Sequence, residues 1–116
     1  MTASDLASKR CKPLDNKVEP LSRQQADTLL GDLHDDWLVD ESGKEISRTF
    51  TFNNYYQTMA FVNVVAWIAH AEDHHPDIEV GYNRCHIRFS THSIDGLSEN
   101  DFICSAKIDA LLPEDS

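Results

Sequence analysis

From residue 21 onwards, hydrophobic and polar positions follow patterns that predict helices and strands in turn. Ser22, followed three residues later by Gln25, has the form of a helix capping box. The next apolar residues recur with helical spacing, which predicts a helix that ends near His34. The stripe consists of Ala26, Leu29, Leu30 and Leu33.

A predicted hairpin follows this helix. Residues 37–39 form a short apolar run, and residues 41–44 contain a glycine suited to a turn. Residues 45–52 alternate between apolar and polar side chains, which is typical of a half-buried strand. Arg48 interrupts the apolar side, so we expect it where the sheet is open or at an edge.

A long helix is predicted over residues 55–72, capped by one of the two asparagines at 53–54. Its apolar residues lie on nearly all sides. Such a wide apolar surface predicts burial on more than one side, either centrally or at a subunit interface.

Two further strands and a final helix complete the pattern. Residues 78–82 and 84–91 alternate in polarity and predict strands. Ser98 is the expected cap of the last helix, with Asp101 at the third position after it, and Pro113 follows the helix end.

The order α-β-β-α-β-β-α predicts an α+β fold, a four-stranded antiparallel sheet with helices packed on one face. We assign residues 21–112 to a single domain. Residues 1–20 are polar, contain two prolines and lack periodicity, so they are predicted to be a flexible N-terminal tail. Residues 113–116 are predicted to be a short C-terminal tail.

Composition excludes several classes of protein. The chain has 116 residues, with 20 acidic and 10 basic side chains and a formal net charge of −10. This length suits one domain, and the acidity counts against nucleic-acid binding, which needs cations for the phosphates. The longest apolar run, residues 64–69, is far shorter than a membrane span, and no secretory signal pattern follows the first residue.

Cysteine usage points to a reducing compartment. Cys11, Cys85 and Cys104 are few, odd in number and widely spaced. Such a set argues against a disulfide framework and against a thiolate zinc site. We therefore expect a cytoplasmic protein.

Histidine is the compositional feature that suggests chemistry. Five of the six histidines lie in one stretch: His70, His74, His75, His86 and His92. Pro76 should end the long helix, which places His74 and His75 at a helix-to-strand junction, while His92 follows the fourth strand. Because imidazole both gives and takes protons near neutrality, these two junctions would form an acid/base site if they meet.

A metal site is an alternative use of the same residues. His70 and His74 have helical spacing, and His86 or His92 could add a ligand. The run lacks the glutamate of H-E-x-x-H, which makes this signal weak. The chain also lacks the glycine-rich phosphate loops and the G-x-S-x-G nucleophile motif.

These motifs resemble the pterin-4a-carbinolamine dehydratase family, over roughly residues 21–110 and without the N-terminal tail. The similarity is carried by His-Ala-Glu-Asp-His-His-Pro at 70–76, Tyr-Asn at 82–83, His86, Ser-Thr-His-Ser at 90–93, Gly-Leu-Ser at 96–98 and Asp101. Trp37 lies upstream at the family's usual distance from the histidine pair.

The resemblance implies a hydro-lyase that dehydrates 4a-hydroxytetrahydropterin to quinonoid dihydropterin. This reaction recycles the cofactor of aromatic amino-acid hydroxylases. The family's fold matches the predicted order of elements, and its members need no metal or organic cofactor. They form dimers or tetramers, which would account for the apolar long helix. No nucleic-acid or membrane partner is expected.

The resemblance also implies roles for individual residues. His74 and His92 correspond to the acid/base pair, and which of them is the acid stays open. His75 corresponds to a group that binds and orients the pterin. Asp101 matches a site aspartate that holds a ring or an imidazole, and Trp37 either flanks the pocket or belongs to the core.

His70 and Asp73 are candidates for a supporting role around these residues. Many family members have an acidic residue at the position of His70, and an imidazole there cannot orient His74 as a carboxylate would. An alternative function is a regulatory or protein-interaction module on the same fold. Animal members bind a homeodomain transcription factor, and some bacterial relatives are linked to expression of phenylalanine hydroxylase.

Overall fold

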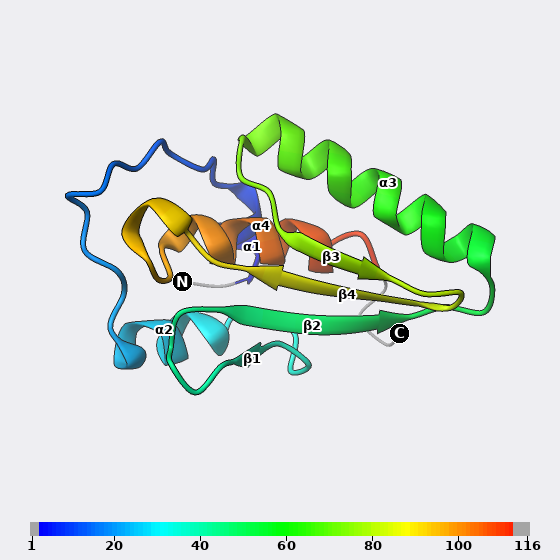
Figure 1. The fold of residues 1–116 in the computed structure, drawn as a ribbon, viewed down its shortest axis with the longest axis horizontal. Helices are drawn as coiled ribbons and strands as arrows, with labels where there is room; N and C mark the ends of the chain where they lie inside the picture. Colours follow the sequence, from blue (N-terminus) through cyan, green and yellow to red (C-terminus); the bar gives the residue numbers. More distant parts are fainter. Residues whose placement is uncertain (1–2, 113–116) are drawn as a thin grey trace.

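The computed structural model describes residues 3–112, so the predicted tail at residues 113–116 lies outside the described residues. No helix in this part of the chain is long and apolar enough to cross a membrane. Figure 1 shows the arrangement of the elements. In chain order they are α1 (Ala3–Ser8), α2 (Arg23–Leu30), β1 (Leu38–Val39), β2 (Ile46–Thr51), α3 (Tyr55–Glu72), β3 (Asp77–Val80), β4 (Arg84–Phe89), the 3-10 helix η1 (His92–Ile94) and α4 (Glu99–Asp109).

The four strands form one antiparallel sheet in the order β1-β2-β4-β3. β2 and β4 pair along their whole lengths, from Ile46 opposite Phe89 to Thr51 opposite Arg84. The α+β prediction is confirmed, because all seven predicted elements occur in the predicted order. α1 and the short η1 are additions to that order.

One face of the sheet is buried and the other is open. Ile46 and Phe50 of β2 point into the core, whereas Thr49 and Thr51 between and after them are exposed. The buried face shares one core with apolar side chains of four helices. These helix residues include Leu6, Ala26, Phe61, Val65, Phe102 and Ile103. The helices therefore pack on one face, as predicted.

The two long helices differ in burial. α3 has the predicted bounds, and the Asn54 side chain caps it by accepting the Gln57 N–H at 2.9 Å. Within the chain, however, α3 is covered on one side only, since Tyr56 and Trp67 are 83% and 69% exposed. α4 is the centrally buried helix, with eight of its 11 residues buried.

The capping box of α2 forms as predicted. Ser22 Oγ accepts the Gln25 N–H at 3.1 Å, and the Gln25 side chain accepts the Ser22 N–H at 2.8 Å. The helix ends at Leu30, earlier than the predicted end near His34, and Gly31 is its C-cap.

Residues 6–11 contact the core, so the flexible tail predicted for residues 1–20 is wrong for this part of it. α1 packs against α4, and Leu6 is fully buried. Behind it, Arg10 Nε lies 2.9 Å from a carboxylate oxygen of Glu72 at the end of α3, and the Cys11 N–H donates to the other oxygen at 2.8 Å. The segment is too short and polar to show a helical period, and its partners lie far along the sequence.

Arg48 is buried, and its predicted position at an edge or opening of the sheet is wrong. The side chain is 6% exposed, and its Nη1 lies 2.7 Å from Asp109 Oδ1. The guanidinium also stacks 4.2 Å from the ring centroid of Phe50. A carboxylate from α4 thus neutralises a cation on the apolar face of β2.

Candidate active site

His74 lies where α3 gives way to β3. Asp73 closes the helix in the left-handed conformation, with φ of 52°, which is a common way for helices to end. The His74 N–H donates to the Ala69 carbonyl at 3.1 Å, and Pro76 prevents any continuation of the helix. The His74 side chain is therefore directed away from α3 and reaches α4.

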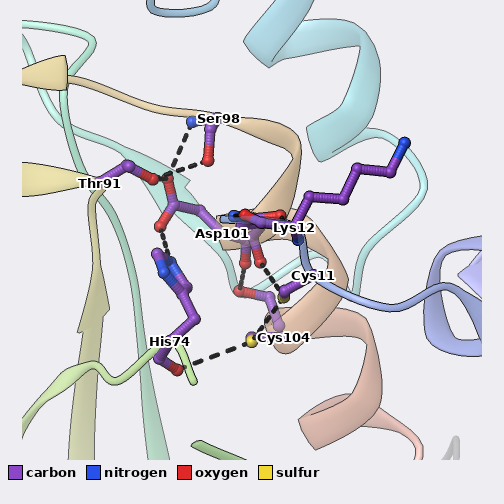
Figure 2. Close-up of polar contacts among 9 residues, drawn as sticks. Cys11, Lys12, His74, Thr91, Ser98, Asp101 and Cys104 are labelled. Atoms are coloured by element: carbon purple, nitrogen blue, oxygen red, sulfur yellow. Dashed lines mark hydrogen bonds and ion pairs between the residues drawn. The ribbon is translucent and has the colours of Figure 1, made fainter. Parts of the chain in front are cut away.

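Asp101 receives the His74 side chain at the beginning of α4 (Figure 2). This carboxylate is fully buried, and its Oδ1 lies 2.6 Å from His74 Nε2. Its Oδ2 accepts the Thr91 hydroxyl at 2.9 Å and the Ser98 N–H at 2.9 Å. Two donors therefore fix one oxygen, and the other is left to orient the imidazole.

This arrangement determines which nitrogen of His74 is available. An ionised carboxylate only accepts hydrogen bonds, so Nε2 carries a hydrogen and the neutral ring has its lone pair on Nδ1. Nδ1 has no hydrogen-bond partner among residues 3–112. The ring also stacks on Phe89, at 5.8 Å between centroids and 7° between planes, which fixes its orientation.

A cleft of about 130 Å³ brings the predicted histidines together. His74, His75 and His92 all line it, and the latter two are exposed. A neighbouring cavity of about 360 Å³ shares Asp73 and His75 with the cleft. Small-molecule sites usually occupy roughly 300–1,000 Å³, so the two hollows together have the size of a ligand site.

The side chains that line the cleft are of a kind suited to proton transfer. Among residues 3–112, no three histidine, cysteine, aspartate or glutamate side chains are grouped closely enough to hold a metal ion. Three imidazoles border one cavity, and one of them is oriented by a buried carboxylate. Such a group can accept and donate protons near neutrality.

The family model described as pterin 4 alpha carbinolamine dehydratase matches residues 19–111. The chain belongs to this family. Its predicted membership, based on the histidine motifs, is thereby confirmed.

Relatives and solved structures agree with this assignment. A protein of Nitrosomonas eutropha, provisionally named pterin-4-alpha-carbinolamine dehydratase, is 57% identical over 93% of this chain and 94% of its own. A transcriptional coactivator/pterin dehydratase of Brucella melitensis matches with a TM-score of 0.77 and 28% identity, over 82% of this chain and all of that chain. A pterin dehydratase-like RuBisCO assembly factor of the alpha-carboxysome has a TM-score of 0.59 and 26% identity, over 67% of this chain and 90% of that chain.

Trp37 belongs to the buried core of this dehydratase-family fold. Its side chain is 1% exposed, and its indole N–H donates to Asp109 Oδ1 at 2.8 Å. It lines neither hollow, and its ring centroid lies 6.4 Å from that of Phe89, on which the His74 ring stacks. Of its two predicted roles, the structure supports the core role, and contact with a pterin stays a prediction.

The side chains of the two predicted supporting residues lie at the site, and neither is hydrogen-bonded to the His74 ring. His70 is exposed on α3, lines the larger hollow and contacts Trp67, with 6.2 Å between ring centroids. Asp73 lines both hollows and closes α3. The carboxylate that orients the imidazole is Asp101, so His70 does not need to supply that function.

The sequence did not reveal that Thr91 and Ser98 both donate hydrogen bonds to the Asp101 carboxylate. Thr91 is buried and bonds both the Asp101 carboxylate and, at 2.7 Å, the Ser98 hydroxyl. The Ser-Thr-His motif draws attention to this threonine. Its donor role still could not be derived from sequence, because its partner lies on another element.

Proposed function

We propose that this chain dehydrates 4a-hydroxytetrahydropterin to quinonoid dihydropterin by histidine acid/base catalysis. The observation that carries the proposal is the buried Asp101–His74 pair beside a cleft that His75 and His92 also line. Family membership supports the substrate class.

Two proton transfers make up the reaction. One proton reaches the leaving 4a-oxygen, and another leaves the ring nitrogen N5 as the C=N bond forms. In our proposal His74 takes the N5 proton through Nδ1, because Asp101 holds its Nε2–H. His92 on η1 protonates the hydroxyl, which departs as water, and His75 positions the ring. Solvent then restores both imidazoles.

Rate measurements on single variants test the mechanism. We expect His74→Ala and His92→Ala each to slow the loss of 4a-hydroxypterin absorbance by about 10²- to 10⁴-fold. His86→Ala is the matched control, because His86 bonds Thr49 at 2.7 Å on the sheet and does not line the cleft. Wild-type rates in both site variants would refute the proposed mechanism.

We also propose that a second copy of the chain covers α3. Tyr56, Val64 and Trp67 are large apolar residues of this helix, and they are 83%, 42% and 69% exposed. A homodimer, or a homotetramer of two such dimers, would bury them. We expect Trp67→Lys to lower the mass measured by light scattering. Leu38→Lys, at an apolar side chain of β1 that is 65% exposed, should leave the mass unchanged.

A protein-interaction module is the second candidate function. Support comes from the names of the two structural relatives, one a transcriptional coactivator/pterin dehydratase and the other a RuBisCO assembly factor. The exposed apolar side of α3 could serve such a partner. A stable partner recovered by purification, together with no dehydratase activity of the pure chain, would favour this function over catalysis.

The proposed setting is the cytoplasm, beside an aromatic amino-acid hydroxylase that uses the recycled pterin. The three cysteines are free thiols, which is typical of proteins in a reducing compartment. In a coupled assay with such a hydroxylase and limiting pterin, adding the chain should increase sustained turnover. Unchanged turnover would contradict the proposed link to an aromatic amino-acid hydroxylase.

A further inference from the structure

Two cysteines from opposite ends of the chain lie side by side. Cys11 follows α1, Cys104 lies in the middle of α4, and their sulfur atoms are 3.5 Å apart although 93 positions separate them (Figure 2). Both are free thiols. A disulfide bond is about 2.05 Å long, so the sulfurs need to approach by roughly 1.5 Å to bond.

The environment of the pair differs between the two thiols. Cys11 is partly exposed, whereas Cys104 is fully buried. The hydrogen bond to Cys11, and after it burial, raise the pKa of the Cys104 thiol well above its usual range. An oxidant from solvent therefore meets Cys11 first, and Cys104 is placed as the resolving thiol.

We propose that Cys11 and Cys104 are a redox-active dithiol that a peroxide converts into an intramolecular disulfide. Hydrogen peroxide oxidises the Cys11 thiol to a sulfenic acid and releases one water. The Cys104 sulfur then attacks the Cys11 sulfur, its proton and the sulfenic hydroxyl leave as a second water, and the S–S bond forms. Two thiols lose two hydrogens, and one peroxide is reduced to two waters.

The cross-link would fasten the N-terminal segment to α4. In the reduced protein, polar contacts hold this segment, among them Lys9 to Glu99 at 3.1 Å and the Lys107 ammonium to the Ala7 carbonyl at 2.6 Å. A covalent bond that closes a loop of this length removes much chain entropy from the unfolded state. The oxidised form should consequently unfold at a higher temperature.

The disulfide would also alter a contact between α4 and the backbone of His74, next to the candidate active site. The Cys104 thiol lies 3.8 Å from the His74 carbonyl oxygen, to which it donates. A disulfide sulfur has no hydrogen to donate. Cys104 is moreover one turn along α4 from Asp101, so the modification reaches the helix that orients the imidazole. This consequence rests on the proposed function, whereas formation of the disulfide does not.

Peptide mapping after peroxide treatment tests the dithiol. The purified protein is treated with hydrogen peroxide, alkylated after denaturation and digested. We expect one cross-linked pair, Cys11–Cys104, while Cys85 is alkylated, so the titratable thiols fall from three to one. Cys85 is the internal control, because it is buried on β4, whereas the sulfur–sulfur contact of the structure joins Cys11 and Cys104.

Thermal unfolding of the same samples tests whether the disulfide stabilises the folded protein. We expect peroxide to raise the Tm of the wild type by roughly 10 °C, and the reductant dithiothreitol to reverse the shift. Cys11→Ser should abolish the cross-link and the shift, whereas Cys85→Ala should keep both. A disulfide between two copies, oxidation of Cys11 without a cross-link, or a cross-link with unchanged Tm would overturn the proposal. These readouts need no pterin, so they fail or succeed independently of the dehydratase assignment.

Discussion

His74 Nε2 and Asp101 Oδ1 are 2.6 Å apart, although 27 positions separate the two residues in the chain. The end of α3 supplies the imidazole, and the first turn of α4 supplies the carboxylate. The same aspartate caps its own helix by accepting the Ser98 N–H. One buried side chain therefore begins a helix and orients the residue we propose as the base.

Asp101→Asn tests that orientation. An amide of the same shape can still accept the Ser98 N–H, but it can present its NH₂ group to His74 and favour the other tautomer. We expect kcat to fall by about 10²-fold or more, with a smaller change in KM. The pH profile of kcat should shift as well, a change that loss of packing alone would not produce.

Asp27→Asn provides the comparison for Asp101→Asn. Asp27 is half-exposed and pairs with Arg23 on α2. Its replacement should leave the rate unchanged. An Asp101→Asn protein with wild-type kcat and an unshifted pH profile would show that the carboxylate does not orient His74.

Thr91→Val removes a donor from Asp101 with little change of shape. The buried carboxylate oxygen would keep only the Ser98 N–H, and the Ser98 hydroxyl would lose its partner. A buried polar group without a hydrogen-bond partner costs roughly 1–3 kcal/mol. We therefore expect the free energy of unfolding to fall by that amount and kcat to fall several-fold. Urea unfolding and steady-state kinetics measure both. Thr51→Val on the exposed face of β2 should alter neither.

The local signals in the sequence predicted the regular elements well. The bounds of α3 followed from an asparagine cap at one end and from the approach to Pro76 at the other. The alternation of β2 and β4 predicted which face is buried. These features depend on residues within one turn or one strand, so the chain order is enough to find them.

Long-range contacts explain what the sequence did not predict. Leu6 and Arg48 were expected to be in a flexible tail and at an edge or opening of the sheet, yet both are buried. α4 packs over Leu6, and Asp109 of α4 neutralises Arg48. The histidine cluster was visible in the sequence. Its orienting carboxylate was seen as a cap and, through the family resemblance, as a site residue, whereas its threonine donor was not identified.

Asp109 should be critical for stability because it serves two buried donors. It lies 2.7 Å from Arg48 Nη1 and accepts the Trp37 indole N–H at 2.8 Å. Asp109→Ala would leave a buried guanidinium without its counter-charge. We expect a loss of about 3–5 kcal/mol in the free energy of unfolding by urea. Asp27→Ala, which breaks a half-exposed pair, should cost less than about 1 kcal/mol. Equal effects would contradict this explanation.

The ionisation of Glu72 makes the attachment of the N-terminal segment depend on pH. Burial by itself would raise the pKa of this carboxyl, but the Cys11 N–H, Arg10 and Lys107 outweigh it and hold the pKa below the usual 4.5. A folded-state pKa below the unfolded value means that ionised Glu72 stabilises the fold. That stabilisation is fully present above the unfolded pKa and is lost as the pH falls through the folded-state pKa.

Glu72→Gln should therefore make the stability of the fold depend less on pH under acidic conditions. The amide can still accept the Cys11 N–H, but it loses the attraction of the Arg10 guanidinium, which lies 2.9 Å from the carboxylate. We expect a lower Tm than wild type near neutrality and a smaller fall in Tm between about pH 5 and pH 3, followed by circular dichroism. Glu41→Gln, at an exposed turn residue, should reproduce the wild-type curve. Parallel curves for Glu72→Gln and the wild type would mean that this carboxylate does not fasten the segment, because only its ionisation makes the contact depend on pH.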